Sequence, residues 1–112
     1  MAGTVQTPGL NYMADGLGQT ATLDLVAAAS TGGVALGNGA TQTVTFTEAA
    51  FGVIDITSDV TLTIDAGETV GSVDLRDVGG NNLAYQTLAS NNAFPSGGDL
   101  IVTSFQITVS GA

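Results

Sequence analysis

Paired carboxylates are the side chains in this sequence that could carry out acid–base catalysis. Asp55 and Asp59 form one closely spaced pair, and Asp74 and Asp77 form another. Two such groups can serve as general acid and general base in the hydrolysis of a glycosidic bond. We favour the alternative, in which these aspartates point outward at strand ends, where a charge discourages one sheet edge from pairing with another.

The sequence lacks the other residue types on which catalysis depends. It contains no cysteine and no histidine, and Arg76 is its single basic residue. Thiol nucleophiles, disulfides, zinc sites and histidine general bases are therefore excluded. The many serine and threonine hydroxyls have neither lysine nor histidine to activate them as nucleophiles. We therefore expect a protein that is not an enzyme and that has no catalytic residues and no cofactor.

One turn offers weak candidates for the binding of a hard cation. Asp74, Asp77 and Asn81 lie around it, and Ca²⁺ prefers carboxylate and amide oxygens as ligands. The spacing matches neither an EF-hand nor a repeated glycine–aspartate calcium loop. We therefore expect no bound metal.

Arg76 has two alternative roles. The one we favour is an exposed or internal ion pair with Asp74, Asp77 or another acid. The other is a contact with a carboxylate of a neighbouring subunit, because arginine is enriched where protein surfaces meet.

The charge of the chain restricts its partners. Its 112 residues include 10 acids and one basic residue, giving a net charge of −9. Nucleic-acid binding is not expected, because phosphate contacts need lysine or arginine. Anionic membrane surfaces are disfavoured for the same reason, and no apolar run approaches the roughly 18 residues of a membrane span. The first residues also lack the basic and apolar regions of a signal peptide.

The N-terminal part of the chain predicts a short helix. A polar arm, residues 1–7, precedes a helix over residues 8–17, in which Pro8 suits the first turn and Gly16 ends the run. The apolar residues at helical spacing are Leu10, Met13, Ala14 and Leu17. This apolar face either packs on the sheet, as we favour, or docks on a partner.

Beyond residue 18 the apolar pattern has the period of two that is typical of strands. Leu23 and Leu25 alternate with the polar Thr22 and Asp24. The residues expected to face the core are Val44, Phe46, Val60, Leu62, Ile64, Val73, Leu75, Phe105, Ile107 and Val109. Asp74 and Arg76 are expected on the opposite face of their strand. Ser30–Gly39 and Asn91–Asp99 read as loops, and the last strand is expected from about Leu100 to Ser110.

Seven or eight short strands separated by turn residues indicate a mainly all-β fold. The expected architecture is an antiparallel β-sandwich or jelly roll with one short N-terminal helix, forming a single domain over residues 1–112. Threonine at the outward positions keeps the surface polar with few charges.

Two stretches resemble a group of small structural proteins of tailed bacteriophages. Gly9–Leu17 is similar to the "N-x-M-L-D-x-L" opening of that group, in which a short helix precedes a strand. Ile64–Leu75, followed by Gly79–Tyr85, resembles its "pAGttV-x-x-vgLwda-gG-t-l-a" stretch. Where members often carry a His-Thr-Ala-Asp-Pro-like run, this chain has Val26–Ser30. The group has no established active site, so the resemblance implies a virion component and no catalysis.

The leading hypothesis is a capsid decoration or cement protein. It would pack on the major capsid protein or another virion protein, reside in the virion after a soluble period in the host cytoplasm, and form a homo-oligomer, with a trimer as the expected state. The candidate interface residues are Val5, Leu10, Tyr12, Met13, Arg76 and Phe94.

Two alternatives stay open. The chain could be a tail-associated subunit, or a receptor- or glycan-binding module at a tail tip. In the second case Tyr12, Tyr85 and Phe94 are the candidate ligand-facing aromatics. An aromatic content of 5% argues against a stacking platform for sugars, although the Ser30–Gly39 loop could serve instead.

Overall fold

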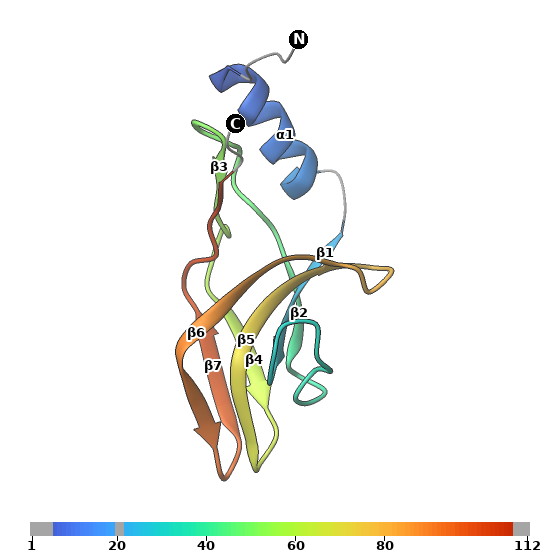
Figure 1. Ribbon diagram of the computed structural model, residues 1–112, viewed down its shortest axis with the longest axis vertical. Coiled ribbons are helices and arrows are strands. Elements are labelled where there is room, and N and C mark those ends of the chain that lie inside the picture. The colour runs from blue at the N-terminus through green and yellow to red at the C-terminus, as the bar shows by residue number, and fades with distance from the viewer. Residues whose placement is uncertain (1–5, 20–21, 109–112) are drawn as a thin grey trace.

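The computed structural model describes residues 6–19 and 22–108. Within these ranges, the side chains left undescribed are those of Thr7, Leu10, Tyr12, Leu17, Gln19, Ala89 and Asn91. This part of the chain forms one helix and eight strands (Figure 1). In chain order the elements are α1 (Thr7–Gln19), β1 (Leu23–Ala28), β2 (Thr41–Val44), β3 (Val53–Ile54), β4 (Val60–Ile64), β5 (Glu68–Asp77), β6 (Asn82–Phe94), β7 (Gly98–Val102) and β8 (Ile107–Thr108).

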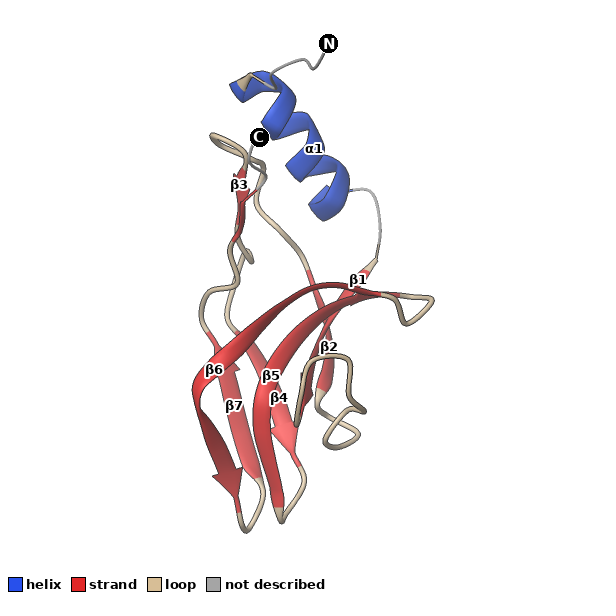
Figure 2. Ribbon diagram, viewed as in Figure 1, coloured by secondary structure: helices blue, strands red, loops and turns tan. Residues whose placement is uncertain are grey.

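The strands form three antiparallel sheets (Figure 2). The largest has the strand order β2-β1-β5-β6, and the two smaller ones are the pairs β4-β7 and β3-β8. This confirms the predicted mainly β, antiparallel fold with one short helix. The jelly-roll connectivity stays a prediction.

Alternation along the strands places an apolar core between the sheets. In β4, Val60, Leu62 and Ile64 are buried whereas Thr61 and Thr63 are exposed. Threonine suits the outward positions because its branched side chain fits a pleated surface and stays polar. The other predicted core residues that are buried are Val44, Phe46, Val73, Leu75 and Phe105, and Leu23 and Leu25 of β1 are buried as well. Ile107 is half-buried, and Val109 lies outside the described residues.

The two sides of this sandwich-like body differ. On one side, backbone hydrogen bonds link the segment before β2 to β4: the N–H of Thr63 donates to the carbonyl of Gly39 and that of Asp65 to the carbonyl of Leu36, each at 2.9 Å. On the other side, β6 and β7 are the outermost strands of their sheets. The body is therefore closed along β2 and β4 and open along β6 and β7.

The helix is longer than predicted. It begins at Thr7 and continues to Gln19, so the expected end at Gly16 was wrong. A glycine inside a helix costs only about 1 kcal/mol relative to alanine, which the packing of the buried Ala14 can offset. No helix in the described part of the chain has the length and hydropathy needed to cross a membrane.

Two strand boundaries were also predicted wrongly. The segment expected as the loop Asn91–Asp99 begins as a strand, because β6 continues to Phe94 in register with Glu68 of β5. The polar residues of this segment suggested a loop. Polar residues also suit an edge strand, because its side chains are exposed to solvent. The expected long last strand is divided into β7 and β8, since the chain leaves β4 after Val102 and then pairs with β3.

Candidate functional site

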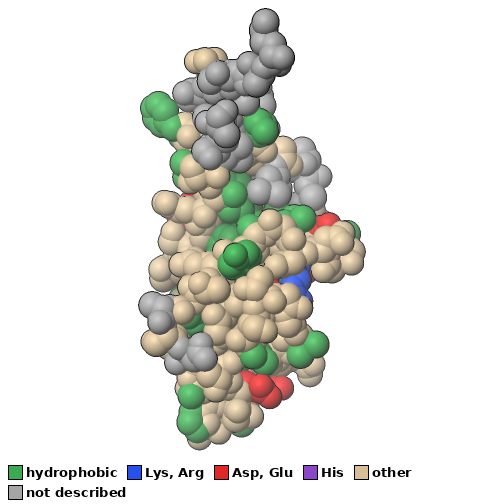
Figure 3. Space-filling model, in the orientation of Figure 1, with side chains coloured by type: hydrophobic (Ala, Val, Ile, Leu, Met, Phe, Trp, Pro, Cys, Tyr) green, Lys and Arg blue, Asp and Glu red, His purple; other side chains and the backbone are tan. Residues whose placement is uncertain are grey.

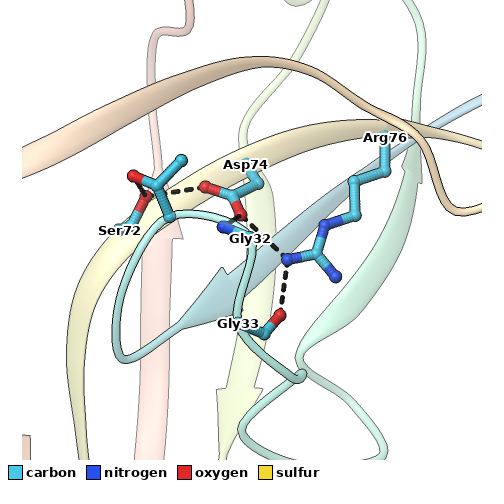
Figure 4. Close-up of polar contacts among 6 residues, drawn as sticks. Gly32, Gly33, Ser72, Asp74 and Arg76 are labelled. Atoms are coloured by element: carbon cyan, nitrogen blue, oxygen red, sulfur yellow. Dashed lines mark hydrogen bonds and ion pairs between the residues drawn. The ribbon is translucent and has the colours of Figure 1, made fainter.

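Asp74 is the centre of a buried polar network rather than an outward charge at a strand end (Figure 4). Its Oδ1 accepts a hydrogen bond from Ser72 Oγ at 2.6 Å. Its Oδ2 accepts from the backbone N–H of Gly32 and from Arg76 Nη2, both at 2.8 Å. The same Nη2 donates to the carbonyl of Gly33 at 2.6 Å. Asp74 and Arg76 share one face of β5, as predicted, and Ser72 lies on it too, but the loop after β1 covers that face.

The network keeps Asp74 ionised. Burial raises the pKa of its carboxyl group, but the hydrogen bonds from Ser72, Arg76 and Gly32, together with the positive charge of Arg76, outweigh burial and lower the pKa. A general acid needs a raised pKa, so this aspartate is unsuited to that role. Of the ion pairs favoured for Arg76, exposed or internal, the structure has the internal one with Asp74, and only 17% of the Arg76 side chain is exposed.

Asp77 and Asn81 bind each other within the turn between β5 and β6. Asp77 Oδ1 accepts from the backbone N–H groups of Gly79 and Asn81 at 2.9 and 3.0 Å, and its Oδ2 accepts from Asn81 Nδ2 at 3.0 Å. These hydrogen bonds, led by those from Asn81, lower the pKa of Asp77. Among the described residues there is no group of three acidic side chains placed to hold a metal ion.

Asp55 joins two distant segments. Its Oδ1 accepts from the backbone N–H groups of Ile56 and Phe105, both at 2.8 Å, and its Oδ2 accepts from Ser104 Oγ at 3.1 Å. Burial raises its pKa, but the backbone hydrogen bonds from Phe105 and Ile56 outweigh it, so the pKa is lowered. Asp55 therefore fixes the segment between β7 and β8 against the chain that follows β3.

Two side chains of α1 attach the helix to the turn before β3. Asn11 Oδ1 accepts from the backbone N–H of Gly52 at 2.6 Å, and Asp15 Oδ1 accepts from that of Ala49 at 2.7 Å. We call α1 together with residues 49–54 the α1–β3 tip. Both residues belong to the stretch that resembles the phage proteins, and their role was not predicted from the sequence. Their spacing of four residues on one helix face was the available signal.

Phe51 is strained and exposed in this tip. It has φ 54°, and it is the only described residue other than glycine with a positive φ. Gly52 follows with φ 76°, and Ala50 and Val53 exchange two backbone hydrogen bonds around the pair. Two-residue hairpins of this kind favour Asn-Gly, because a bulky side chain in the left-handed region costs roughly 1–2 kcal/mol. The Phe51 side chain is nevertheless 80% exposed.

The predicted interface residues are spread over several environments. Met13 is 55% exposed and lies in the α1–β3 tip. Phe94 is half-buried against the core, and Arg76 is held in the internal network. Val5 and the side chains of Leu10 and Tyr12 lie outside the described residues.

The grooves give little support to a sugar-binding site. A groove of about 490 Å³ lies beside β2 and β4, and threonine, serine and glutamine dominate its lining. None of the described residues lining it is aromatic, so it offers no stacking platform. Of the candidate aromatics, Tyr85 is exposed and borders a second groove, beside β6.

The chain matches no protein-family model, and comparisons with curated proteins and with solved structures find no match. The resemblance to phage structural proteins therefore depends on the residues quoted for it alone.

Proposed function

We propose that this chain is a non-enzymatic structural subunit of a bacteriophage virion that decorates the capsid shell and docks through its α1–β3 tip. The observation that carries the proposal is Phe51, an exposed aromatic side chain held in a strained backbone conformation. Strain of this kind persists at ligand and partner contacts more often than elsewhere. Aromatic side chains are also the typical anchors of protein interfaces.

The polar contacts of the tip support this role. Asn11 and Asp15 fix the turn that presents Phe51, and Met13 adds exposed apolar surface on the same element. A presented aromatic loses little conformational freedom when it enters a pocket, because its backbone is already fixed. Repeated over many identical copies on a shell, even a weak contact of this kind gives firm attachment.

The hydrogen bonds of three aspartates also support a structural role. Asp55, Asp74 and Asp77 each accept several hydrogen bonds within the chain and have lowered pKa values. Their oxygens hold loops and turns in place, which is what a structural subunit requires of them.

The first experiment is the Phe51→Asn variant, which creates the favoured Asn-Gly turn. We expect the isolated protein to become more stable by about 1 kcal/mol and its attachment to virions that lack the native protein to fall at least tenfold. Urea denaturation measures the first effect and co-sedimentation with the particles the second. Val34→Asn, at a similarly exposed position in the loop after β1, is the control and should leave attachment unchanged.

Cryo-EM of purified virions tests the location directly. Density for the protein on the shell would support decoration, whereas density at the tail would place the same docking mode on a tail component. Absence of the protein from particles, or full attachment of the Phe51→Asn variant, would overturn the proposal. Binding to a glycan array that Tyr85→Ala abolishes would favour the receptor-binding alternative.

A further inference from the structure

The open side of the body leaves two strand edges unpaired within the described part of the chain. Among the strands of residues 22–108, β6 pairs only with β5, and β7 pairs only with β4. Two grooves lie along this side, one between Ala84–Gln86 and residues 104–108, the other between Gln86, Leu88 and β7. We call this region, formed by β6, β7 and residues 103–108, the β6–β7 seam; β6 and β7 run side by side in Figure 1.

The apolar core is incompletely covered along the seam. Most of the half-buried apolar side chains that pack against the core belong to it: Ala84, Leu88, Phe94, Leu100, Val102 and Ile107. Leu83, Tyr85 and Ile101 add side chains that are 42%, 59% and 57% exposed. Apolar surface gathered along one side in this way is typical of a surface that another protein covers.

The edge of β6 also lacks the features that usually prevent pairing. Exposed edge strands tend to be short or to carry lysine, proline or inward charges. β6 has 13 residues, none of them charged and none of them proline. The register between β5 and β6 shifts at two places, between Val70 and Ser72 and between Leu75 and Arg76.

The charge distribution indicates what covers the seam. Nine of the ten acids lie before residue 78, and Asp99 is the single charged residue from there to the C-terminus. In Figure 3 the lower left of the visible face, where Figure 1 places the end of β6 beside β7, shows no red or blue among the atoms that are not grey. Two copies of a chain with a net charge of −9 repel each other over most of their surface. The seam contains one acid, Asp99 in β7, and Asp55 is hydrogen-bonded to it at Ser104 and Phe105. With so few charges along β6 and β7, we expect the repulsion between two copies to be weaker there than over the rest of the chain.

From these observations we infer that the β6–β7 seam is the surface through which copies of this chain associate, with the edge of β6 lying against the seam of a second copy. Backbone N–H and C=O groups of the unpaired edges then find partners, and the half-buried apolar side chains of both copies become covered. This goes beyond the proposed function, because it concerns contacts between copies and not the docking partner. Either can fail while the other stands.

The first test is the mass of the purified protein in solution. We expect light scattering after size-exclusion chromatography to show concentration-dependent oligomers at micromolar protein. Association should strengthen severalfold as salt rises, because the screening length falls from about 30 Å at 0.01 M to about 3 Å at 1 M and weakens the repulsion between copies. A monomer at all protein and salt concentrations would overturn the inference.

Adding negative charge to the seam tests whether the contact lies there. The double variant Leu83→Glu and Tyr85→Glu should weaken association at least tenfold. Val34→Glu with Val78→Glu adds the same charge at two more exposed positions, 82% and 80%, and should change association much less. Equal weakening by both double variants would show that charge alone is responsible and would overturn the inference. Circular dichroism confirms that each variant remains folded.

Cysteine cross-linking gives an independent readout, because the chain contains no cysteine. Tyr85→Cys and Ile101→Cys, oxidised separately and as a mixture, should give covalent dimers at protein concentrations where oligomers form. Val34→Cys and Val78→Cys are the controls, since their greater exposure favours cross-linking by random collision. The inference is wrong if the controls cross-link as fast as the seam variants, or if the seam variants do not cross-link at all.

Discussion

A single carboxylate, that of Asp74, holds together parts of the chain that the sequence separates by about forty residues. It binds the backbone of Gly32 and the side chains of Ser72 and Arg76. We expect Asp74→Ala to lower the free energy of unfolding by about 3 kcal/mol, because it leaves a mostly buried guanidinium without its charge partner. Urea denaturation measures the change. Asp59→Ala, in an exposed turn, should stay within about 0.5 kcal/mol of the wild type.

The lowered pKa values of Asp55, Asp74 and Asp77 set the response to acid. In the unfolded chain an aspartate titrates near about 3.9. The folded state binds these protons less readily, so the stabilisation is complete above that pH and is lost as the pH falls through the lower folded pKa. We expect stability to change little from about pH 7 to 5 and to fall below about pH 4. In Asp74→Asn the fall should be shallower; an identical acid profile for this variant would contradict the assignment.

For single residues, the sequence predicted which face of a strand a side chain lies on better than it predicted whether that side chain is buried. The period of two predicted that Asp74 and Arg76 share one face of their strand, opposite Val73 and Leu75. The burial of Asp74 and Arg76 does not follow, because it depends on where the loop after β1 folds. Gly32 supplies an N–H and Gly33 a C=O to this network. Every residue type has these backbone groups, so a pattern of side chains cannot predict which of them take part.

Among the elements, α1 depends on two side chains for its position. We expect Asn11→Ala to cost about 1 kcal/mol and Asp15→Ala about 2 kcal/mol, because a hydrogen bond to a carboxylate is stronger than one to an amide oxygen. Hydrogen exchange should show faster exchange at the amides of Ala49 and Gly52, with protection in β1 and β5 retained. Met13→Ala, an exposed position on the same helix, is the control. Loss of protection in every strand would show that the helix supports the whole body instead.

The elements themselves were partly predictable. Buried strands such as β4 show a clear alternation, and β4 was predicted at its observed position. The extension of β6 to Phe94 and the separation of β8 from β7 were not predicted, because edge strands and short pairs take their structure from partners and not from their own side chains. The α1–β3 tip was missed for a related reason: Phe51 lies in a turn whose strain appears only in the backbone conformation.

For the whole molecule, a low fraction of charged residues, many threonines and an apolar pattern with a period of two were enough to predict the fold class. The proposed contact surfaces could not be predicted in the same way. The seam arises because β6 and β7, adjacent in sequence, end two different sheets. An open side of this kind is a property of topology, and one sequence without its strand pairing does not reveal it.

The pairing of the strands also implies an order of events during folding. β5 pairs with β6, which follows it in sequence. β4 pairs with β7, although both β5 and β6 lie between them in the chain. Thr63 and Asp99, which share a hydrogen bond, are 36 positions apart. Closing such a long loop costs less entropy once the inner pair has already formed. The β5–β6 pair is therefore expected to form first, and β4 and β7 to join around it.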